Sequence, residues 1–507
     1  MSDDFTREEI VVLDPYVTST DRPIYALKNL PEEVVAVLFA YYSRSRESLR
    51  RNLLKLIRER DIDLDARLDT SSLGAAELTT AQEKARQFHE KWVVGYGHAS
   101  VAEHAVVHLA IEDVSIIATK IIEDTRLASY TEKSTRYVLF DGEKFCRVPR
   151  LMRSPHAGLY EDTVRFLFNT YVALVPQVVA CIKARVPRRA AQGERAYETA
   201  CHAKAYDLLR YLLPAATLTN LGLTINARAL EHLLTKLLSD PLEEVHHVGA
   251  AMKHEAEKVV PTLLKYADYN AYRAETDQAM RQLGQDVLAE AGPPETPAVT
   301  LVRFPVDAEE QLAAAILYGY TDISWLQIVE QVGKLDAEAR TRIIDEYLRR
   351  RGPHDQPLRA LEHLYYSFDL VLDYGAYRDI QRHRMATQTR QSLSTRYGYS
   401  VPDDLVAYGF GDTFQTCMER AALAYNRIAG EYPLEAQYVL PLAYRIRVLF
   451  TWNLRELFHF IQLRSAKQGH FSYRRVAQQV YAEIERVHPA LARYIRVDQS
   501  DYQLGRL

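Results

Sequence analysis

The chain has 507 residues, of which 48% are hydrophobic and 26% are charged, and its formal net charge at pH 7 is −4. This length and composition are typical of a soluble globular protein of two or three domains with a substantial core. The small negative charge excludes the global basic field that a nucleic-acid-binding or membrane-surface protein would carry.

Cysteine usage predicts a reducing compartment. The four cysteines form no Cys-x-x-Cys pair and no evenly spaced framework, so we interpret them as buried or incidental thiols. The acidic N-terminus lacks the pattern of a signal peptide, and we find no apolar run of membrane-spanning length. We therefore expect a cytoplasmic protein with no nucleic-acid or membrane partner.

Periodicity along the chain predicts mostly helices with a few short strands. Apolar residues recur three and four apart in four stretches, which predicts amphipathic helices there: residues 208–212, 233–238, 312–316 and 343–348. Partial alternation at period two predicts strands over residues 105–111, 135–140 and 364–372. The fold class that follows is α+β, with small antiparallel sheets flanked by helices.

An internal repeat organises the chain. Ser-Thr-Arg-Tyr occurs at both 134–137 and 394–397, each time after an arginine-containing segment. Leu-Pro followed by Asn-x-Arg recurs without a gap at 213–228 and 440–455, and Glu-His recurs at 103 and 362. Such ordered matches indicate a tandem duplication. We predict copy one over residues 1–285 and copy two over residues 300–507, joined by a Pro- and Gly-rich linker, residues 286–299.

Several charged residues are candidates for binding chemistry. Arg382, His383 and Arg384 place three potential cations together, and guanidinium groups bind phosphate bidentately. Ser392, Ser394 and Arg396 follow and could complete a monophosphate cradle, although the triplet could equally be a salt-bridged helix end. Arg464 lies in a strongly apolar stretch, where a charge either meets a partner or ligand or faces solvent.

Three other patterns carry less information. His104 and His108 have metal-ligand spacing for a helix, but the stretch alternates as a strand and no third ligand follows. Gly95-Tyr-Gly97 lacks the third glycine of a dinucleotide fingerprint. No serine, cysteine and histidine set has a recognisable catalytic signature. If the protein is an enzyme, a cofactor is expected to carry the difficult step.

These motifs together resemble the flavin-dependent thymidylate synthase (ThyX) family. Residues 382–397 of this chain contain Arg-His-Arg, seven residues, Ser and then Ser-x-Arg-Tyr, which is similar to the family motif. The segment from Gly97 to His104 resembles the family's upstream Gly-His-x-Thr-x-x-Glu-His. The stretch from Leu440-Pro441 to Leu463-Arg464 resembles its C-terminal helix. The resemblance implies two tandem ThyX-like domains, FAD as cofactor, dUMP or a close pyrimidine nucleotide as substrate, methylenetetrahydrofolate as one-carbon donor and NADPH as reductant. Members need no active-site cysteine.

The resemblance also implies roles for individual residues of this chain. Arg464 would be catalytic, by polarising the pyrimidine ring. The implied cofactor-binding residues are Arg382, His383, Arg384, Asn453, Arg455, His98, Ser100 and Glu103. The implied substrate-binding residues are Glu132, Ser134, Arg136, Tyr137, Arg210, Ser394 and Arg396. No metal site is implied.

The two copies differ in a complementary way. Copy one has Asp124-Thr125-Arg126 in place of Arg-His-Arg and Leu237 in place of Arg464. Copy two has Ser392 where copy one has Glu132, counting back from Ser-Thr-Arg-Tyr, and Gln437 where copy one has Arg210. We therefore predict composite sites built from both copies, in a homodimer that imitates the ThyX tetramer. The alternative is a non-catalytic tandem paralogue that binds flavin or nucleotide for a structural or regulatory role.

Overall fold

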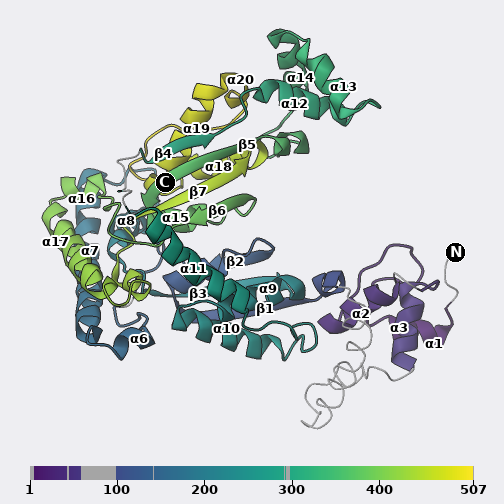
Figure 1. Cartoon of the computed structure of the whole chain (residues 1–507), viewed down its shortest axis with the longest axis horizontal. Coiled ribbons are helices and arrows are strands. Elements are labelled where there is room, and N and C mark those ends of the chain that lie inside the picture. The colour runs from purple at the N-terminus through teal and green to yellow at the C-terminus, as the bar shows by residue number, and fades with distance from the viewer. Residues whose placement is uncertain are drawn as a thin grey trace. The chain divides into compact units, whose positions relative to one another are not determined.

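The protein is represented by a computed structural model (Figure 1), which describes residues 5–42, 45–58, 99–140, 142–289, 292 and 297–505. The chain divides into two compact units. Unit 1 holds residues 1–112, 127–132 and 220–289, and unit 2 holds residues 113–126, 133–219 and 290–507. These units are a different division from the sequence repeat, because residues 133–219 of copy one belong to the same unit as copy two. The boundaries of the two copies stay a prediction.

Unit 1 begins with a small helical cluster. Helices α1 (Arg7–Leu13), α2 (Glu32–Tyr42) and α3 (Leu49–Arg58) enclose an apolar core of their own. A 3-10 turn, η3 (Ala99–His104), then leads into a three-stranded sheet of order β1-β3-β2. Its strands are β1 (Val106–Ser115), β2 (Ala128–Glu132) and β3 (Leu218–Asn226).

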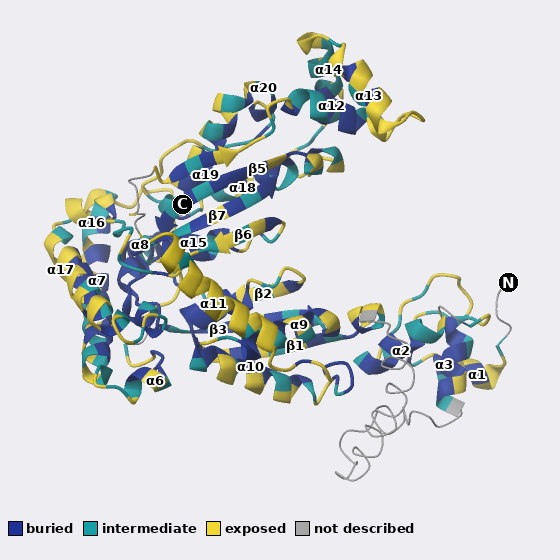
Figure 2. Ribbon diagram, in the orientation of Figure 1, coloured by how far each residue is buried: buried dark blue, intermediate teal, exposed yellow. Residues whose placement is uncertain are grey.

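Three further helices complete unit 1. Helices α9 (Ala227–Leu238) and α10 (Glu243–Ala256) pack against each other. Gly249 permits this close approach, because a Cβ atom there would lie 2.7 Å from the Cβ of Leu237. Helix α11 (Ala271–Val287) buries none of its residues, as its exposed colouring in Figure 2 shows.

Unit 2 contains a four-stranded antiparallel sheet of order β4-β5-β7-β6. The strands are β4 (Val299–Arg303), β5 (Tyr365–Asp373), β6 (Ala386–Arg390) and β7 (Arg445–Asn453). Copy two therefore repeats, in β5-β7-β6, the order β1-β3-β2 of copy one. This agreement in topology supports the predicted duplication, and the α+β class is confirmed.

Unit 2 also contains helices from both copies. Copy one contributes α5 (Ile116–Ile122), α6 (Pro149–Met152), α7 (Ala157–Arg185), α8 (Glu194–Leu209) and the 3-10 turn η4 (Arg210–Leu212). Copy two contributes α12 (Ala308–Tyr318), α13 (Trp325–Gly333), α14 (Ala337–Leu348), η5 (Arg359–His363), α15 (Tyr374–Ile380), α16 (Asp403–Ala407), α17 (Gly411–Ala429), η6 (Glu435–Val439), α18 (Leu454–Ser465), α19 (Phe471–Val487) and α20 (Pro489–Ala492).

The two copies meet in unit 2 through equivalent residues. Pro214 of copy one bridges Pro441 of copy two, and these are the two prolines of the repeated Leu-Pro motif. The amide of Ala215 donates to the carbonyl of Leu440, while the amide of Leu442 donates to the carbonyl of Leu213. Reciprocal contacts of this kind define a local two-fold axis, as at a symmetric dimer interface. The duplication thus places a pseudo-symmetric contact between the two copies inside one chain.

Two sequence-based expectations about the elements are wrong. Residues 135–140 form turns and coil instead of a strand, because the strand β2 ends at Glu132 and the Ser134 hydroxyl then accepts from the Arg136 amide in a tight turn. Helix α7 is long and apolar enough, by length and composition, to cross a membrane, although no such run was expected. It packs against α8 and α17 and buries a stripe of apolar side chains, as the core helix of a globular unit does.

The other predicted elements are confirmed. Strands β1 and β5 cover the alternating stretches 105–111 and 364–372 almost completely. The stretches 233–238, 312–316 and 343–348 lie in α9, α12 and α14, and residues 208–212 span the end of α8 and the turn η4.

Candidate functional site

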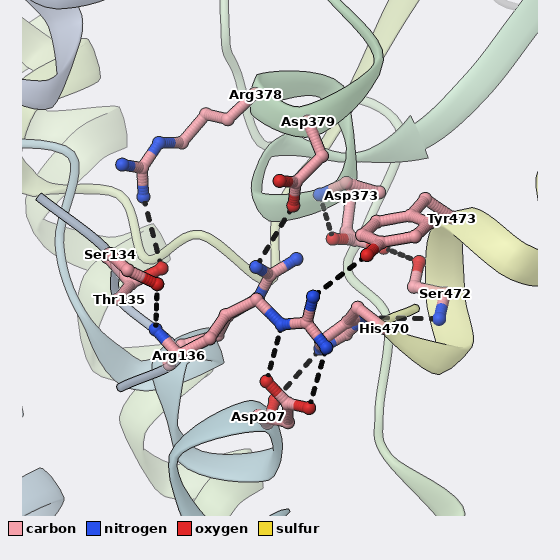
Figure 3. A network of polar contacts seen from close by, with 12 residues as sticks. Ser134, Thr135, Arg136, Asp207, Asp373, Arg378, Asp379, His470, Ser472 and Tyr473 are labelled. Atoms are coloured by element: carbon pink, nitrogen blue, oxygen red, sulfur yellow. Dashed lines mark hydrogen bonds and ion pairs between the residues drawn. The ribbon is translucent and has the colours of Figure 1, made fainter. Parts of the chain in front are cut away.

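A cluster of buried and partly buried charges from both copies lies within unit 2, and Figure 3 shows the part of it around Arg136, Asp207 and Asp379. We call it the composite centre and define it as Arg136, Asp207 and Arg210 of copy one with Asp379, Arg464 and Tyr473 of copy two. The helices α8 and α15 supply the carboxylates, α18 and α19 supply Arg464 and Tyr473, and η4 supplies Arg210. Residues of the two copies therefore meet inside one compact unit of one chain, and a composite ligand site stays a prediction.

The guanidinium of Arg136 is fully engaged by the protein. Its Nε and Nη2 donate to the two carboxylate oxygens of Asp207 at 2.7 and 3.0 Å, and Nη1 donates to the Tyr473 hydroxyl at 2.8 Å. Nη2 also donates to the carbonyl of Gln468. Although burial by itself would lower the pKa of Arg136, the Asp207 carboxylate raises it. Arg136 thus anchors the loop before α19 and has little capacity left for a ligand.

Arg210 differs from Arg136 in keeping open hydrogen-bond donors. The residue is 2% exposed, and its Nη1 lies 3.2 Å from the Asp379 carboxylate. Neither Nε nor Nη2 has a hydrogen-bond partner among the residues that the structure describes. Gly375 makes room for the group, since a Cβ there would lie 3.3 Å from both nitrogens. Buried donors without an acceptor cost about 1–3 kcal/mol each, so a ligand that brings acceptor oxygens would relieve this cost.

Asp379 lies in the positive field of the centre. Burial alone would raise the pKa of its carboxyl group, but the charges of Arg210, Arg464, Arg136 and Arg382, in that order, lower it to about 2. The carboxylate is therefore ionised at neutral pH. The arginines that act on it outnumber the two carboxylates of the centre, and the excess of positive charge suits an anionic ligand.

Arg464 is held by a chain of hydrogen bonds that starts at Glu456. The Glu456 carboxylate lies 3.0 Å from Nδ1 of His383, and Nε of Arg464 lies 2.8 Å from Nε2 of the same ring. Burial lowers the pKa of His383 well below its usual value, and the Arg464 charge lowers it further. The cation of Arg464 also lies over the Tyr473 ring, 5.3 Å from its centroid.

The residues that the resemblance assigned to the cofactor have varied surroundings. Arg382 is exposed, and Arg384 donates to the carbonyl of Arg126 at 2.9 Å. Asn453 caps the N-terminus of α18 by accepting from the Glu456 amide. Arg455 is bound to Glu362 and to the carbonyl of Pro357.

Copy one repeats this last arrangement in unit 1. Asn226 caps α9, and Arg228 forms an ion pair with Glu103 at 2.6 Å. The repeated Glu-His and Asn-x-Arg motifs are thus joined by the same ion pair in each copy, which is a structural role for both motifs. Ser100 is exposed in η3, and His98 lies outside the described residues.

The predicted substrate residues are dispersed. Glu132 is buried at the end of β2 in unit 1 and does not belong to the composite centre of unit 2. The Ser134 and Ser394 hydroxyls each accept from the amide of the arginine two residues later. Tyr137 is 59% exposed, and Arg396, the counterpart of Arg136, is also exposed.

Sheet register corrects one sequence equivalence. Glu132 pairs with Leu221 of β3, whereas Arg390 pairs with Val448 of β7, and both stand at the fifth position of their strands. Arg390 is therefore the structural counterpart of Glu132, and Ser392 is not. The two extra residues of copy two lie in the loop after β6, because counting back from Ser-Thr-Arg-Tyr cannot locate an insertion.

The pseudo-symmetric position of the centre has lost its charges. Ile121 of α5 stands where α15 has Asp379, since both helices begin one residue after their caps, Ser115 and Asp373. Gln437 replaces Arg210, and its side-chain oxygen accepts from the Leu393 amide at 2.9 Å. Leu237, which replaces Arg464, is packed into the core of unit 1 against Gly249.

A small cavity adjoins the centre, and the described residues include no candidate metal site. Across the residues that the structure describes, no group of three or more histidine, cysteine or acidic side chains could hold a metal ion. A cavity of about 40 Å³ borders Asp207, lined by Lys204, Lys467, Arg474 and the C-terminal residues 502–505. It has room for about three water molecules and is too small for a nucleotide.

Sequence reasoning missed the partners that give the centre its geometry, namely Asp207, Asp379, Glu456, His470 and Tyr473. For Asp379, the only signal in the local sequence is that it precedes Arg382 by three residues. Glu456 stands at the third helical position after an Asn cap, a pattern that predicts a capping role, but its carboxylate binds His383 instead. The remaining partners are far apart along the chain and carry no local pattern.

Comparison with known proteins places the chain in a family. The family described as thymidylate synthase complementing protein (Thy1) matches residues 53–262 and again residues 300–490. The chain therefore belongs to the Thy1 family, in a tandem form that carries the family region twice.

Similar proteins fall into two groups. A UPF0159 protein of Chlamydia muridarum is 39% identical, with 99% of this chain and 97% of that protein covered. A UPF0159 protein of Thermoplasma acidophilum is 30% identical, with 87% and 94% covered. A flavin-dependent thymidylate synthase of Pyrococcus furiosus is 28% identical over 34% of this chain and 62% of its own length. Full-length similarity is thus to UPF0159 proteins, and similarity to a flavin-dependent synthase extends over part of the chain.

Among solved structures, a ThyX of Helicobacter pylori complexed with FAD and dUMP has a TM-score of 0.30 and 17% identity, covering 38% of this chain and 97% of that chain. A UMP/dUMP methylase, PolB, of Streptomyces cacaoi has a TM-score of 0.32 and 19% identity, covering 39% of this chain and 93% of that chain.

Proposed function

We propose that this protein is a flavin-dependent transferase of the thymidylate synthase type. It would carry out reductive methylation of dUMP or a close pyrimidine nucleotide, with methylenetetrahydrofolate as one-carbon donor and NADPH as reductant. Membership of the Thy1 family and partial similarity to flavin-dependent thymidylate synthases support this class of reaction.

The observation that carries the proposal is the composite centre. Arg210 of copy one has two buried donors without an acceptor among the described residues, and Arg464 of copy two uses only its Nε in a hydrogen bond. The charges of both arginines act on Asp379. In this proposal Arg210 binds the nucleotide phosphate, and Arg464 stabilises negative charge that develops on the pyrimidine ring. Arg136 would hold the loop before α19 in place, through Asp207 and Tyr473.

The residues present partly fit a flavin dinucleotide. Arg384 uses a single hydrogen bond, to the carbonyl of Arg126, so it keeps guanidinium donors for a diphosphate, and the exposed Arg382 adds a second positive charge two residues earlier. His383, Asn453 and Arg455 are occupied by protein partners, and we propose structural roles for them instead. The flavin would supply the redox and one-carbon relay chemistry.

The cysteines support a mechanism without a thiol nucleophile. Cys146, Cys201 and Cys417 are buried, and burial raises the pKa of the Cys201 and Cys417 thiols. A buried, protonated thiol is a poor nucleophile. The remaining cysteine, Cys181, lies in α7, which contributes no residue to the composite centre.

The loss of charge at the pseudo-symmetric position implies one complete site per chain. A homodimer would then bring together four copies of the family fold, with two charged and two uncharged positions. The ThyX-like tetramer that the sequence suggested would be built in this way.

The test begins with the visible spectrum and the flavin content of the purified protein. Because one complete site per chain is proposed, we expect about one FAD per chain. The next assay is dUMP methylation in the presence of methylenetetrahydrofolate and NADPH. Arg382→Ala should weaken the binding free energy of FAD by roughly 1.5–3 kcal/mol for each charged hydrogen bond lost, so less flavin should be retained. Asp124→Ala, at the matching position of copy one, is the control and should leave retention unchanged.

Three results would contradict the proposal. Two flavins per chain would contradict the single site, and equal effects of the two variants would contradict the assignment to copy two. A protein that takes up no added FAD would exclude the flavin-dependent reaction.

One observation favours the alternative of a binding protein without turnover. Asp207 already occupies the guanidinium of Arg136, one of the cations that the resemblance assigns to the nucleotide, so the centre departs from the residue set that the resemblance implies for turnover. Binding of flavin and nucleotide without product formation, under conditions in which a flavin-dependent thymidylate synthase turns over, would establish this second function.

A further inference from the structure

The chain from Glu456 through His383 to Arg464 determines the state of the histidine. An arginine side chain has only N–H donors, so Nε2 of His383 must accept the bond from Nε of Arg464. A neutral imidazole with Nε2 as acceptor carries its proton on Nδ1. Nδ1 must then donate to Glu456, whose oxygen lies 3.0 Å away. The donor inventory therefore selects one tautomer, with the proton on Nδ1.

Packing holds this ring in one orientation. The His383 side chain is 2% exposed, and the Glu456 side chain is 11% exposed. Phe460 contacts the ring edge-to-face with centroids 5.0 Å apart, and His459 lies at 5.4 Å. Glu456, Phe460 and Arg464 are spaced four residues apart on α18 and so share one face of the helix, against which His383 docks.

The ring and its partners leave the rest of Arg464 available. Its Nε is bound to His383, and its two Nη groups have no hydrogen-bond partner among the described residues. The position of the guanidinium plane is set by the Nε bond on one side and by the Tyr473 ring on the other. The two Nη groups would therefore present up to four N–H donors in one orientation.

We propose that Glu456 is a positioning residue that orients Arg464 through His383 in its Nδ1–H form. This inference rests on the proposed function in so far as Arg464 is taken to act on the nucleotide ring. It replaces the flavin contact that resemblance assigned to His383, because both ring nitrogens are occupied. Copy one has lost the whole arrangement, with Ala229, Thr125 and Leu237 at the corresponding positions.

The first experiment measures the tautomer directly and needs no catalysis. Long-range ¹H–¹⁵N spectra of the full chain, with the His383 signals assigned from their loss in His383→Gln, distinguish a protonated Nδ1 from a protonated Nε2. We expect the Nδ1–H form in the wild type. An Nε2–H or a doubly protonated ring at neutral pH would overturn the inference, whatever reaction the protein performs.

The second experiment tests the consequence for Arg464. Glu456→Leu removes the acceptor, and the misplaced guanidinium should lower kcat by about 10–100-fold, since a small misplacement of a catalytic group costs this much. The dissociation constant for dUMP, measured by calorimetry, should change by less than about threefold, because Arg210 holds the phosphate. Glu456→Gln keeps an acceptor oxygen and should restore most of kcat.

A matched control separates positioning from stability. Glu435 is a buried carboxylate of unit 2 that pairs with Arg150 outside the composite centre. Glu435→Leu should lower the melting temperature and leave kcat unchanged. If Glu456→Leu likewise changes only the melting temperature, Glu456 is structural and the inference is wrong. If the wild type shows no turnover at all, the proposed function fails, while the His383 tautomer still tests the hydrogen-bond chain from Glu456 to Arg464 by itself.

Discussion

Replacing Arg210 by glutamine should abolish tight binding of the nucleotide phosphate. Glutamine is the residue that copy two carries at the equivalent position, Gln437, so the variant gives both positions the same uncharged side chain. Arg210 has two buried donors without protein acceptors. A charged hydrogen bond contributes about 1.5–3 kcal/mol, so the loss of two gives roughly 3–6 kcal/mol. The dissociation constant for dUMP should therefore rise by about 10²–10⁴-fold.

The same substitution also affects folding, and the structure shows how to separate the two effects. Removing one partner of a buried ion pair costs about 3–5 kcal/mol, because the other charge is left uncompensated. Asp379 keeps the charges of Arg464, Arg136 and Arg382 nearby, which makes that figure an upper bound here. The double variant Arg210→Gln with Asp379→Asn removes both charges and should recover much of the lost stability without recovering dUMP affinity.

Isothermal titration calorimetry with dUMP, with and without FAD, measures the effect, and a thermal scan monitors folding. Arg150→Gln is a suitable control, because Arg150 is half-exposed and pairs with Glu435 away from the centre. The reasoning is refuted if folded Arg210→Gln binds dUMP within about threefold of the wild type, since two charged hydrogen bonds cannot be lost at so small a cost.

Two more predictions concern the structural residues of the centre. Arg136→Ala breaks a buried pair with Asp207 and should lower the free energy of unfolding by about 3–5 kcal/mol. Arg396→Ala, at the exposed equivalent position, should change the free energy of unfolding by less than about 0.5 kcal/mol. Equal losses for the two variants, measured by chemical denaturation, would contradict these roles. His470 is fully buried, and burial together with the charges of Arg210 and Arg136 lowers its pKa well below the usual value. Because the unfolded chain protonates this histidine near pH 6.5 and the folded chain does so only at a much lower pH, His470 contributes a loss of stability of about 1.4 kcal/mol per pH unit as the pH falls below 6.5. The slope should be shallower in His470→Gln, and an unchanged slope would show that His470 takes up a proton in the folded state.

Local sequence patterns predicted the duplication, the α+β class and helical stretches that lie in α8, α9, α12 and α14. These features depend on regularities that are visible in the sequence itself, such as the spacing of apolar residues along a helix and the repeated order of motifs. The complementary loss of charges between the copies was also visible in the sequence. It anticipated that Arg210 of copy one and Arg464 of copy two would belong to one centre, and both charges act on Asp379 in unit 2.

The sequence could not rank the arginines by availability. Arg136 and Arg210 have the same side chain, and the resemblance assigned both to the nucleotide. Arg136 is fully hydrogen-bonded because Asp207 and Tyr473, which are 71 and 337 residues away along the chain, surround its guanidinium. Within the described part of the chain, Arg210 hydrogen-bonds to Asp379 alone, and its Nε and Nη2 have no partner.

The sequence by itself therefore determined which family the chain resembles, where its repeat lies and which residue types remain in each copy. Tertiary structure alone decided which of those residues are still open to a ligand. It placed Arg390 in register with Glu132, and it engaged His383 between Glu456 and Arg464, 73 and 81 residues away. The physical reason is that a buried polar group must find a hydrogen-bond partner, and which partner it finds depends on packing between distant segments.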